Sequence, residues 1–223
     1  WTAYIPSNEL LTFYKLNKAK NYGDYISAIN HFVCPAQNFV FASKSGDIAI
    51  KQQGIFPLVE PNRDKFILDG SRSENDMNRF IPIEENPSVL NPERGFVSSA
   101  NQHPTDESYP YYYSSGEFEY NRNRRINDVL SSREKHSIAD MMKLQGDNYN
   151  YTAAMVLPKL LEIAHASGIK NKWLDYLNTW NYMYEADSKE AVIFDTWWAE
   201  IQSLLWDELT DKKVILSPPE QYI

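Results

Sequence analysis

The sequence predicts an α+β fold, in which helical and β-rich segments follow one another in blocks. Two observations support this class. Apolar residues recur at helical spacing at both ends of the chain, whereas short apolar runs between turn residues, typical of strands, occupy the part between them. We therefore expect a helical segment (1–35), a β-rich part (36–121) and a second helical region (122–223).

The composition excludes several classes of function. The chain has 223 residues, of which 43% are hydrophobic, so it can bury a sizeable core. Its net charge of -8 suits neither nucleic acid nor an anionic membrane as a partner. No apolar run approaches the length of a membrane span. A single cysteine, Cys34, excludes an internal disulfide and leaves the cellular compartment open.

The first helical stretch is predicted over residues 8–32. Leu10, Phe13 and Tyr14 recur on one face, and the pattern continues further along the stretch. Ser7 or Asn8 is the expected N-terminal cap.

The β-rich part begins with a predicted hairpin. Two apolar runs, 38–42 and 48–50, flank the turn Lys44-Ser45-Gly46-Asp47. The segments "KFILDG" (65–70) and "GFVSSA" (95–100) read as further strands, and residues 71–95 read as a long ordered loop.

The second helical region carries its own start and stop signals. Ser137 and Asp140 form a plausible capping pair before "IADMMKLQ". Gly168 is the expected stop of the helix in "TAAMVLPKLLEIAHA". Asp187 and Glu190 are predicted to cap the last helix, "KEAVIFDTWWAEIQSLL".

The common nucleotide, zinc-protease and paired-cysteine motifs are absent from the sequence. Two other features could carry chemistry. In "NPERGFVSSANQHP" the apolar run ends at Asn101, which is either a turn-capping amide or a catalytic one. In "YNRNRRINDVL", Arg122 and two further arginines stand at a helix start, where they oppose the helix dipole. They either pair with acidic surface groups, or one of them points into a site.

Several motifs in fixed order resemble those of the penicillin acylase (penicillin amidase) family of N-terminal-nucleophile hydrolases. The similar segments cover most of the chain. They are "WTAYIPSNELLTFYKLNKAKNYGDYISAINHF", "CPAQNFVFASKSGDIAIKQQGIFP", "LDG", "FIPIEENPSVLNPERGFVSSANQHP", the Arg-x-x-Arg-Ile helix and "LQGDNYNYTAAMVLP".

The resemblance implies a fold, an activity and two site residues. The family fold is a four-layer αββα core with helical insertions, of which this chain would be a fragment. The activity is hydrolysis of an acyl amide through an acyl-enzyme, without an organic cofactor. Asn101 matches the asparagine that donates to the oxyanion hole, and Arg122 matches an arginine that orients groups near the nucleophile.

The chain also departs from the family. No segment matches the one that begins with the nucleophile, so we expect a piece of a catalytic subunit that is inactive alone. Its partners would then be the missing parts of that subunit, a small subunit from the same precursor and a small acyl amide. Where calcium-binding relatives have a carboxylate, this chain has "YPYYYSS". We therefore expect no metal ligands in this chain, although the parent protein could hold a structural calcium. The family implies a periplasmic or secreted protein.

A second interpretation is a non-catalytic module that binds a ligand or glycan. Its basis is the high tyrosine content, which includes a cluster that could line a groove. The cluster consists of Tyr109, Tyr111, Tyr112 and Tyr113.

Overall fold

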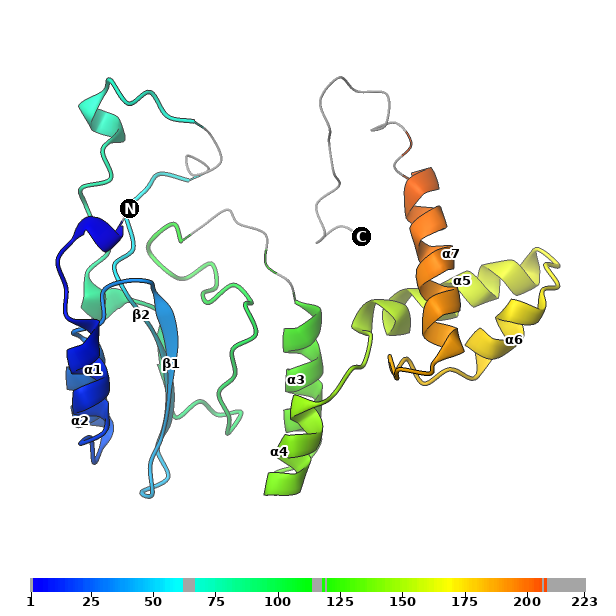
Figure 1. Cartoon of the computed structure of the whole chain (residues 1–223), viewed down its shortest axis with the longest axis horizontal. Helices are drawn as coiled ribbons and strands as arrows, with labels where there is room; N and C mark the ends of the chain where they lie inside the picture. The colour runs from blue at the N-terminus through cyan, green and yellow to red at the C-terminus, as the bar shows by residue number, and fades with distance from the viewer. Residues whose placement is uncertain (1, 62–66, 114–117, 119, 206, 208–223) are drawn as a thin grey trace. The chain divides into compact units, whose positions relative to one another are not determined.

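The computed structural model divides into two compact units, residues 1–116 and 117–223 (Figure 1). Helices and one three-stranded sheet make up an α+β fold, which confirms the predicted class. No helix of the described part has the length and apolarity needed to cross a membrane. The described residues are 2–61, 67–113, 118, 120–205 and 207.

The first unit begins with a 3-10 turn (η1, Thr2–Tyr4) and two helices, α1 (Glu9–Leu16) and α2 (Tyr22–Ile29). The predicted helical stretch 8–32 is therefore interrupted. The side chain of Asn21 accepts a hydrogen bond from the Asp24 N–H at 2.9 Å and starts α2 as a separate helix. Asn8 occupies the N-cap position of α1 without a side-chain capping bond.

The sheet has the order β1-β2-β3 and is antiparallel throughout: β1 is Gln37–Ala42, β2 is Ile48–Gln53 and β3 is Ser88–Leu90. The predicted hairpin is confirmed as β1 and β2. The short strand β3 lies inside the segment that was predicted as a loop, 71–95, together with the 3-10 turns η3 (Ser73–Asn75) and η4 (Ile83–Glu85). Three residues are too few to show a strand pattern, so pairing with β2 decides their conformation.

Helix α2 covers one face of this sheet (Figure 1). The ring of Tyr25 lies 4.9 Å from that of Phe41, and the ring of Phe32 lies 5.0 Å from that of Phe39. Tyr25, Ile29 and Phe32 are buried in this contact. The aromatic residues of β1 and the apolar face of α2 thus form the core of the first unit.

Polar side chains are buried where β2 meets the following segment. Lys51 is 5% exposed, and its ammonium donates to the carbonyl oxygen of Ile83 at 2.9 Å. Burial lowers the pKa of this ammonium. The Asn86 amide donates to the carbonyl oxygen of Gly54 at 2.9 Å. A Cβ atom at Gly54 would lie 2.6 Å from the Cβ of Ala36, so only glycine fits there. These contacts fix the end of β2 against its neighbours.

Two further predicted strands are not found in the part of the chain that the structure describes. Residues 65–66 of the segment 65–70 lie outside the described residues, and residues 67–70 adopt no strand. The prediction for residues 95–100 is wrong, because this segment has no strand assignment. A strand requires a backbone partner. Among the described residues the segment meets β1 through a side-chain bond, from the Asn38 amide to the Ser99 hydroxyl at 2.7 Å.

The second unit is helical, as predicted. The predicted capping pair is confirmed, because Ser137 and Asp140 form a complete capping box at the start of α4. Gly168 ends α5 with a positive φ of 70°, also as predicted. The helices among the described residues of this unit are α3 (Asn121–Ser131), α4 (Ile138–Gln145), α5 (Tyr151–Ala166), α6 (Lys172–Asn178) and α7 (Lys189–Leu205).

The start of α7 corrects one prediction. The hydroxyl of Ser188, rather than the carboxylate of Asp187, accepts the Ala191 N–H at 3.2 Å. The two candidates are adjacent in sequence, and a serine hydroxyl serves this position as well as a carboxylate does. The core of the unit lies between α5, α6 and α7 and includes Leu157, Leu177, Trp180 and Phe194.

Candidate active site

The segment that leads to Asn101 begins with a tight turn. The Gly95 N–H donates to the carbonyl oxygen of Pro92 at 2.9 Å, and Gly95 has a φ of 74°. The Arg94 guanidinium then lies 4.7 Å from the centre of the Phe96 ring and donates to the Phe96 carbonyl oxygen at 2.9 Å. These local contacts hold the start of the segment.

The end of the segment is held by hydrogen bonds on both sides of Asn101. The Ala100 N–H donates to the side-chain oxygen of Gln102 at 2.8 Å, and the Gln102 amide donates to the Ser98 carbonyl oxygen at 3.3 Å. Ala100 is buried at 5% exposure, and Asn38 of β1 donates to the Ser99 hydroxyl. Asn101 therefore follows a backbone that its neighbours fix in place.

Asn101 itself is exposed and has a φ of 61°, in the left-handed region. Asparagine is among the few residue types other than glycine that adopt this conformation readily. The conformation bends the chain after Ala100, at a point where the asparagine side chain is accessible. Both the turn-capping and the catalytic interpretation are compatible with this geometry.

His103 and Tyr113 anchor the chain beyond Asn101. The His103 ring makes an edge contact with the Tyr113 ring at 5.5 Å between centroids, and Tyr113 contacts Phe56 at 5.3 Å. Burial raises the pKa of the Tyr113 hydroxyl, although a hydrogen bond with Gln52 opposes the shift. The segment after Asn101 is thus packed against residues at and just beyond the end of β2.

The other tyrosines of the predicted cluster also make contacts within the unit. The Tyr109 hydroxyl donates to the Glu85 carbonyl oxygen at 3.0 Å, and the Tyr111 hydroxyl donates to the Glu85 carboxylate. The bond to the carboxylate raises the pKa of Tyr111. These contacts give Tyr109, Tyr111 and Tyr113 a part in holding the first unit together.

Arg122 lies in the first turn of α3, which contains no acidic residue, and its side chain is exposed. The two neighbouring arginines have different surroundings. Arg125 makes a two-point ion pair with Asp147, at 3.0 and 2.7 Å, and lies 4.2 Å from the centre of the Tyr149 ring. Arg124 donates to the sulfur of Met155 at 3.3 Å. Arg125 therefore links α3 to the segment between α4 and α5.

The two predicted site residues belong to different units, Asn101 to the first and Arg122 to the second. Sequence reasoning did not single out Asn38 and Gln102, whose side chains hold the segment before and around Asn101. The only signal for Asn38 was its place in the "PAQN" motif of the resemblance.

The described residues offer no evident metal site. No group of three or more His, Cys, Asp or Glu side chains lies together in the part of the chain that the structure describes. In the segment "YPYYYSS", the Tyr111 hydroxyl donates a hydrogen bond to the Glu85 carboxylate. The described side chains of this segment therefore do not fit a calcium site.

The fold itself is that of an acylase of known structure. The chain is similar to a thermostable penicillin G acylase from Alcaligenes faecalis, with a TM-score of 0.70 and 18% sequence identity. The match covers 90% of this chain but 38% of that chain, so this sequence spans well under half of the relative.

The family follows from the sequence match. The family model described as penicillin amidase matches residues 1–222. This chain belongs to the penicillin amidase family, and the resemblance drawn from its motifs is confirmed.

Proposed function

We propose that this chain is part of the catalytic subunit of an amidohydrolase that cleaves an amide between an acyl group and an amine. The family membership supports this reaction class. The parent protein would use an N-terminal nucleophile, whose own amine serves as the base, and would form an acyl-enzyme. No segment of this sequence matches the nucleophile segment, so we assign the nucleophile to another part of the parent.

Asn101 is the residue on which the proposal depends most. Acyl transfer builds negative charge on a carbonyl oxygen, and a fixed amide donor can stabilise that charge. The exposed side chain of Asn101 follows a backbone held by Ala100, Gln102 and Asn38. A donor on such a backbone is positioned before the reaction begins, which supports a role in the oxyanion hole.

The test of Asn101 uses the complete, processed parent enzyme. We predict that Asn101→Ala lowers kcat by about 10² to 10³-fold with a smaller change in KM, because the amide acts mainly in the transition state. Asn101→Gly should lose as much, although glycine adopts the observed φ without strain. Asn101→Asp should be at least as damaging, since a carboxylate repels the developing charge.

The matched control is Asn91→Gly. Asn91 is also a left-handed asparagine, with a φ of 49°, but its side chain joins β3 to β2 through Ile48 and Asp47. The folded Asn91→Gly enzyme should keep kcat within a few-fold of the wild type. If Asn101→Gly also kept it, Asn101 would be a turn residue and the assignment would be wrong.

Arg122 is proposed to orient polar groups near the nucleophile and the substrate. Its place on α3, in a first turn without an acidic residue, supports this role over that of a helix-stabilising charge. We predict that Arg122→Ala lowers kcat/KM by about 10- to 100-fold, whereas Arg124→Ala, on the same helix, has little effect. Steady-state kinetics on both folded variants decides it, and equal effects would count against a specific role for Arg122.

The remaining assignments extend the same proposal. The partners would be the other parts of the catalytic subunit, a small subunit from the same precursor, and a small acyl amide such as a β-lactam or an acyl-homoserine lactone. No organic cofactor is needed for this chemistry. We place the parent protein in the periplasm or outside the cell, by analogy with the family.

A further inference from the structure

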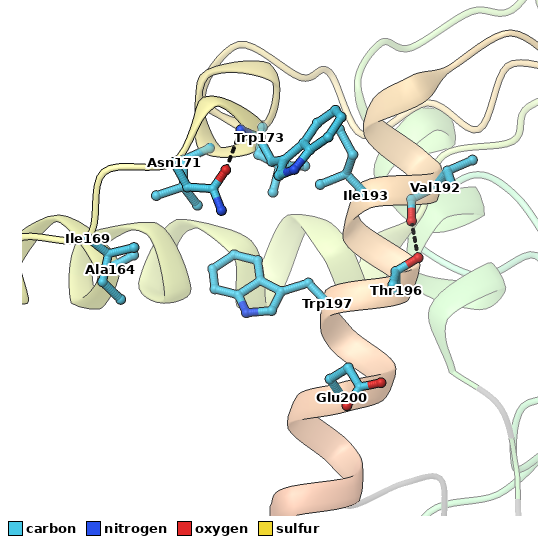
Figure 2. Close-up of a pocket in the computed structure, with 11 residues that line it drawn as sticks. Ala164, Ile169, Asn171, Trp173, Val192, Ile193, Thr196, Trp197 and Glu200 are labelled. Carbon is cyan, nitrogen blue, oxygen red and sulfur yellow. Dashed lines mark hydrogen bonds between the residues drawn. The ribbon is translucent and has the colours of Figure 1, made fainter.

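The second unit contains an open pocket of about 410 Å³ between α5, α6 and α7 (Figure 2). Its volume falls in the range of small-molecule sites, roughly 300–1,000 Å³. The floor is apolar and buried, with Ala164 at 3%, Leu174 at 8% and Leu177 at 2% exposure. Neither the fold nor the proposed amide hydrolysis assigns a role to this pocket.

Two indole rings line the pocket from different helices. Figure 2 shows the ring of Trp197 projecting from α7 and Trp173 lying on α6. Trp173 is 46% exposed, so its ring remains accessible to a ligand. The Lys172 ammonium lies 4.5 Å from the centre of this ring, so one face of Trp173 already contacts a cation and Trp197 is the indole left for the cation of a ligand.

The polar groups of the lining differ in how they are used. The Thr196 hydroxyl donates to the Val192 carbonyl oxygen at 2.8 Å, and the Asn171 side-chain oxygen accepts the backbone N–H of Trp173 at 3.1 Å (Figure 2). Glu200 is exposed and makes no hydrogen bond or ion pair with any residue that the structure describes. The pocket lining therefore carries one charge, a carboxylate, one helical turn from Trp197.

We propose that this pocket binds an organic ammonium ion with an aromatic body. The apolar floor would take the body, the indoles would contact the ring and the cation, and the Glu200 carboxylate would pair with the ammonium. The net charge of -8 also favours a cation over an anion. An aliphatic floor, two indoles and a single carboxylate select against carboxylates and phosphates.

The first experiment compares three ligands of one shape. Calorimetric titration of the whole 223-residue chain uses 2-phenylethylammonium, 2-phenylethanol and phenylacetate. We expect the ammonium to bind with a Kd of about 1 mM. It should bind about 3- to 10-fold more tightly than the alcohol, and the carboxylate should bind weakest. Added salt should reduce the preference for the ammonium.

Three variants locate the site. Glu200→Gln keeps the shape of the side chain and should abolish the preference for the ammonium over the alcohol. The control is Glu162→Gln on α5, since Glu162 is exposed, pairs with Lys159 and lies outside the pocket. Trp197→Phe should weaken the binding of the ammonium, because an indole attracts a cation more strongly than a phenyl ring does. Indole N–H resonances that shift on titration should disappear in Trp173→Phe or Trp197→Phe.

Four outcomes would overturn the proposal. The first is equal binding of ammonium and alcohol to the wild type. The second is a preference that survives in Glu200→Gln. The third is no heat and no indole shift at about 10 mM ammonium. Indole shifts in this chain that are absent from the complete parent protein would mean that another part of the parent fills the pocket, which also contradicts the proposal. None of these outcomes bears on the amidase test at Asn101.

Discussion

At the scale of single residues, two asparagines show why a sequence alone could not assign the site. Asn91 and Asn101 both adopt a left-handed conformation, and both follow a short apolar run. The side chain of Asn91 joins two strands, whereas Asn101 ends a segment that the hydrogen bonds between Ala100 and Gln102 hold. Local sequence favours asparagine for this conformation in either case. The resemblance to a family, and not the spacing of residues, singled out Asn101.

Gly54 is a residue whose importance only the structure reveals. It combines a φ of 152° with an approach so close that a Cβ would lie 2.6 Å from the Cβ of Ala36. Nothing in the sequence around it distinguishes it from the glycine of a turn, because the neighbour that crowds it comes from a different part of the chain.

We predict that Gly54→Ala lowers the free energy of unfolding of the first unit by about 2 kcal/mol or more, through steric overlap and backbone strain. The measurement is urea unfolding followed by circular dichroism. Gly70→Ala is the matched control, since no atom lies within 4 Å of its added Cβ and its φ is not in the left-handed region. Equal stability of the two variants would show that the backbone around Ala36 adjusts freely.

At the scale of elements, the sequence predicted helices better than strands. Helical periodicity, helix caps and tight turns are local signals. The capping box at Ser137, the helix stop at Gly168 and the turn of the β1–β2 hairpin were therefore visible in the sequence. Helix α6 was missed because its seven residues are too short to establish a period. The strand predicted at residues 95–100 is wrong for a non-local reason. An apolar run forms a strand only where another strand is available to pair with it.

The ion pair between Arg125 and Asp147 connects α3 to the segment after α4 and should make the second unit sensitive to acid. Asp147 is 10% exposed, and the guanidinium beside it holds the pKa of its carboxyl below the usual value. A lowered folded pKa stabilises the fold above the unfolded pKa of about 4. That contribution is lost as the pH falls through the folded pKa.

We therefore predict that Asp147→Asn costs about 1–2 kcal/mol at pH 7 and makes the loss of stability between about pH 5 and pH 2 shallower. Chemical unfolding at a series of pH values measures both effects. Asp175→Asn on α6 is the control, because Asp175 makes no hydrogen bond or ion pair within the described residues. A wild-type pH profile that Asp147→Asn leaves unchanged would rule out this ion pair as the acid-sensitive group.

At the scale of the whole molecule, the chain resembles a piece of a larger fold. It covers 38% of the acylase that it matches, and the sheet of its first unit exposes apolar side chains. Val40 of β1 and Val89 of β3 lie opposite Ile50 of β2 and are 59% and 44% exposed. They lie on the face that α2 does not cover. Composition predicted a core but could not show which face would remain open.

This open face and the edge of β1 lead us to predict self-association of the chain. Sedimentation velocity from about 10 µM to about 1 mM should show larger species at higher concentration. Val40→Lys should reduce them, because a charge on the exposed face opposes stacking and edge pairing. Ser45→Lys, in the hairpin turn, adds the same charge away from that face and should have little effect. A wild-type chain that stays monomeric throughout would contradict the prediction.

The distribution of indole rings between the two units has a practical consequence for spectroscopy. Five of the six tryptophans belong to residues 117–223, and Trp180 and Trp198 contact Phe194 in the core there. Emission excited at wavelengths that tyrosine does not absorb therefore reports mainly on the second unit. The sequence of the first unit contains one tryptophan, Trp1, and the core of that unit is rich in tyrosine and phenylalanine. A chain with Trp1→Phe would separate the two optically, so that the unfolding of each unit could be followed in one sample.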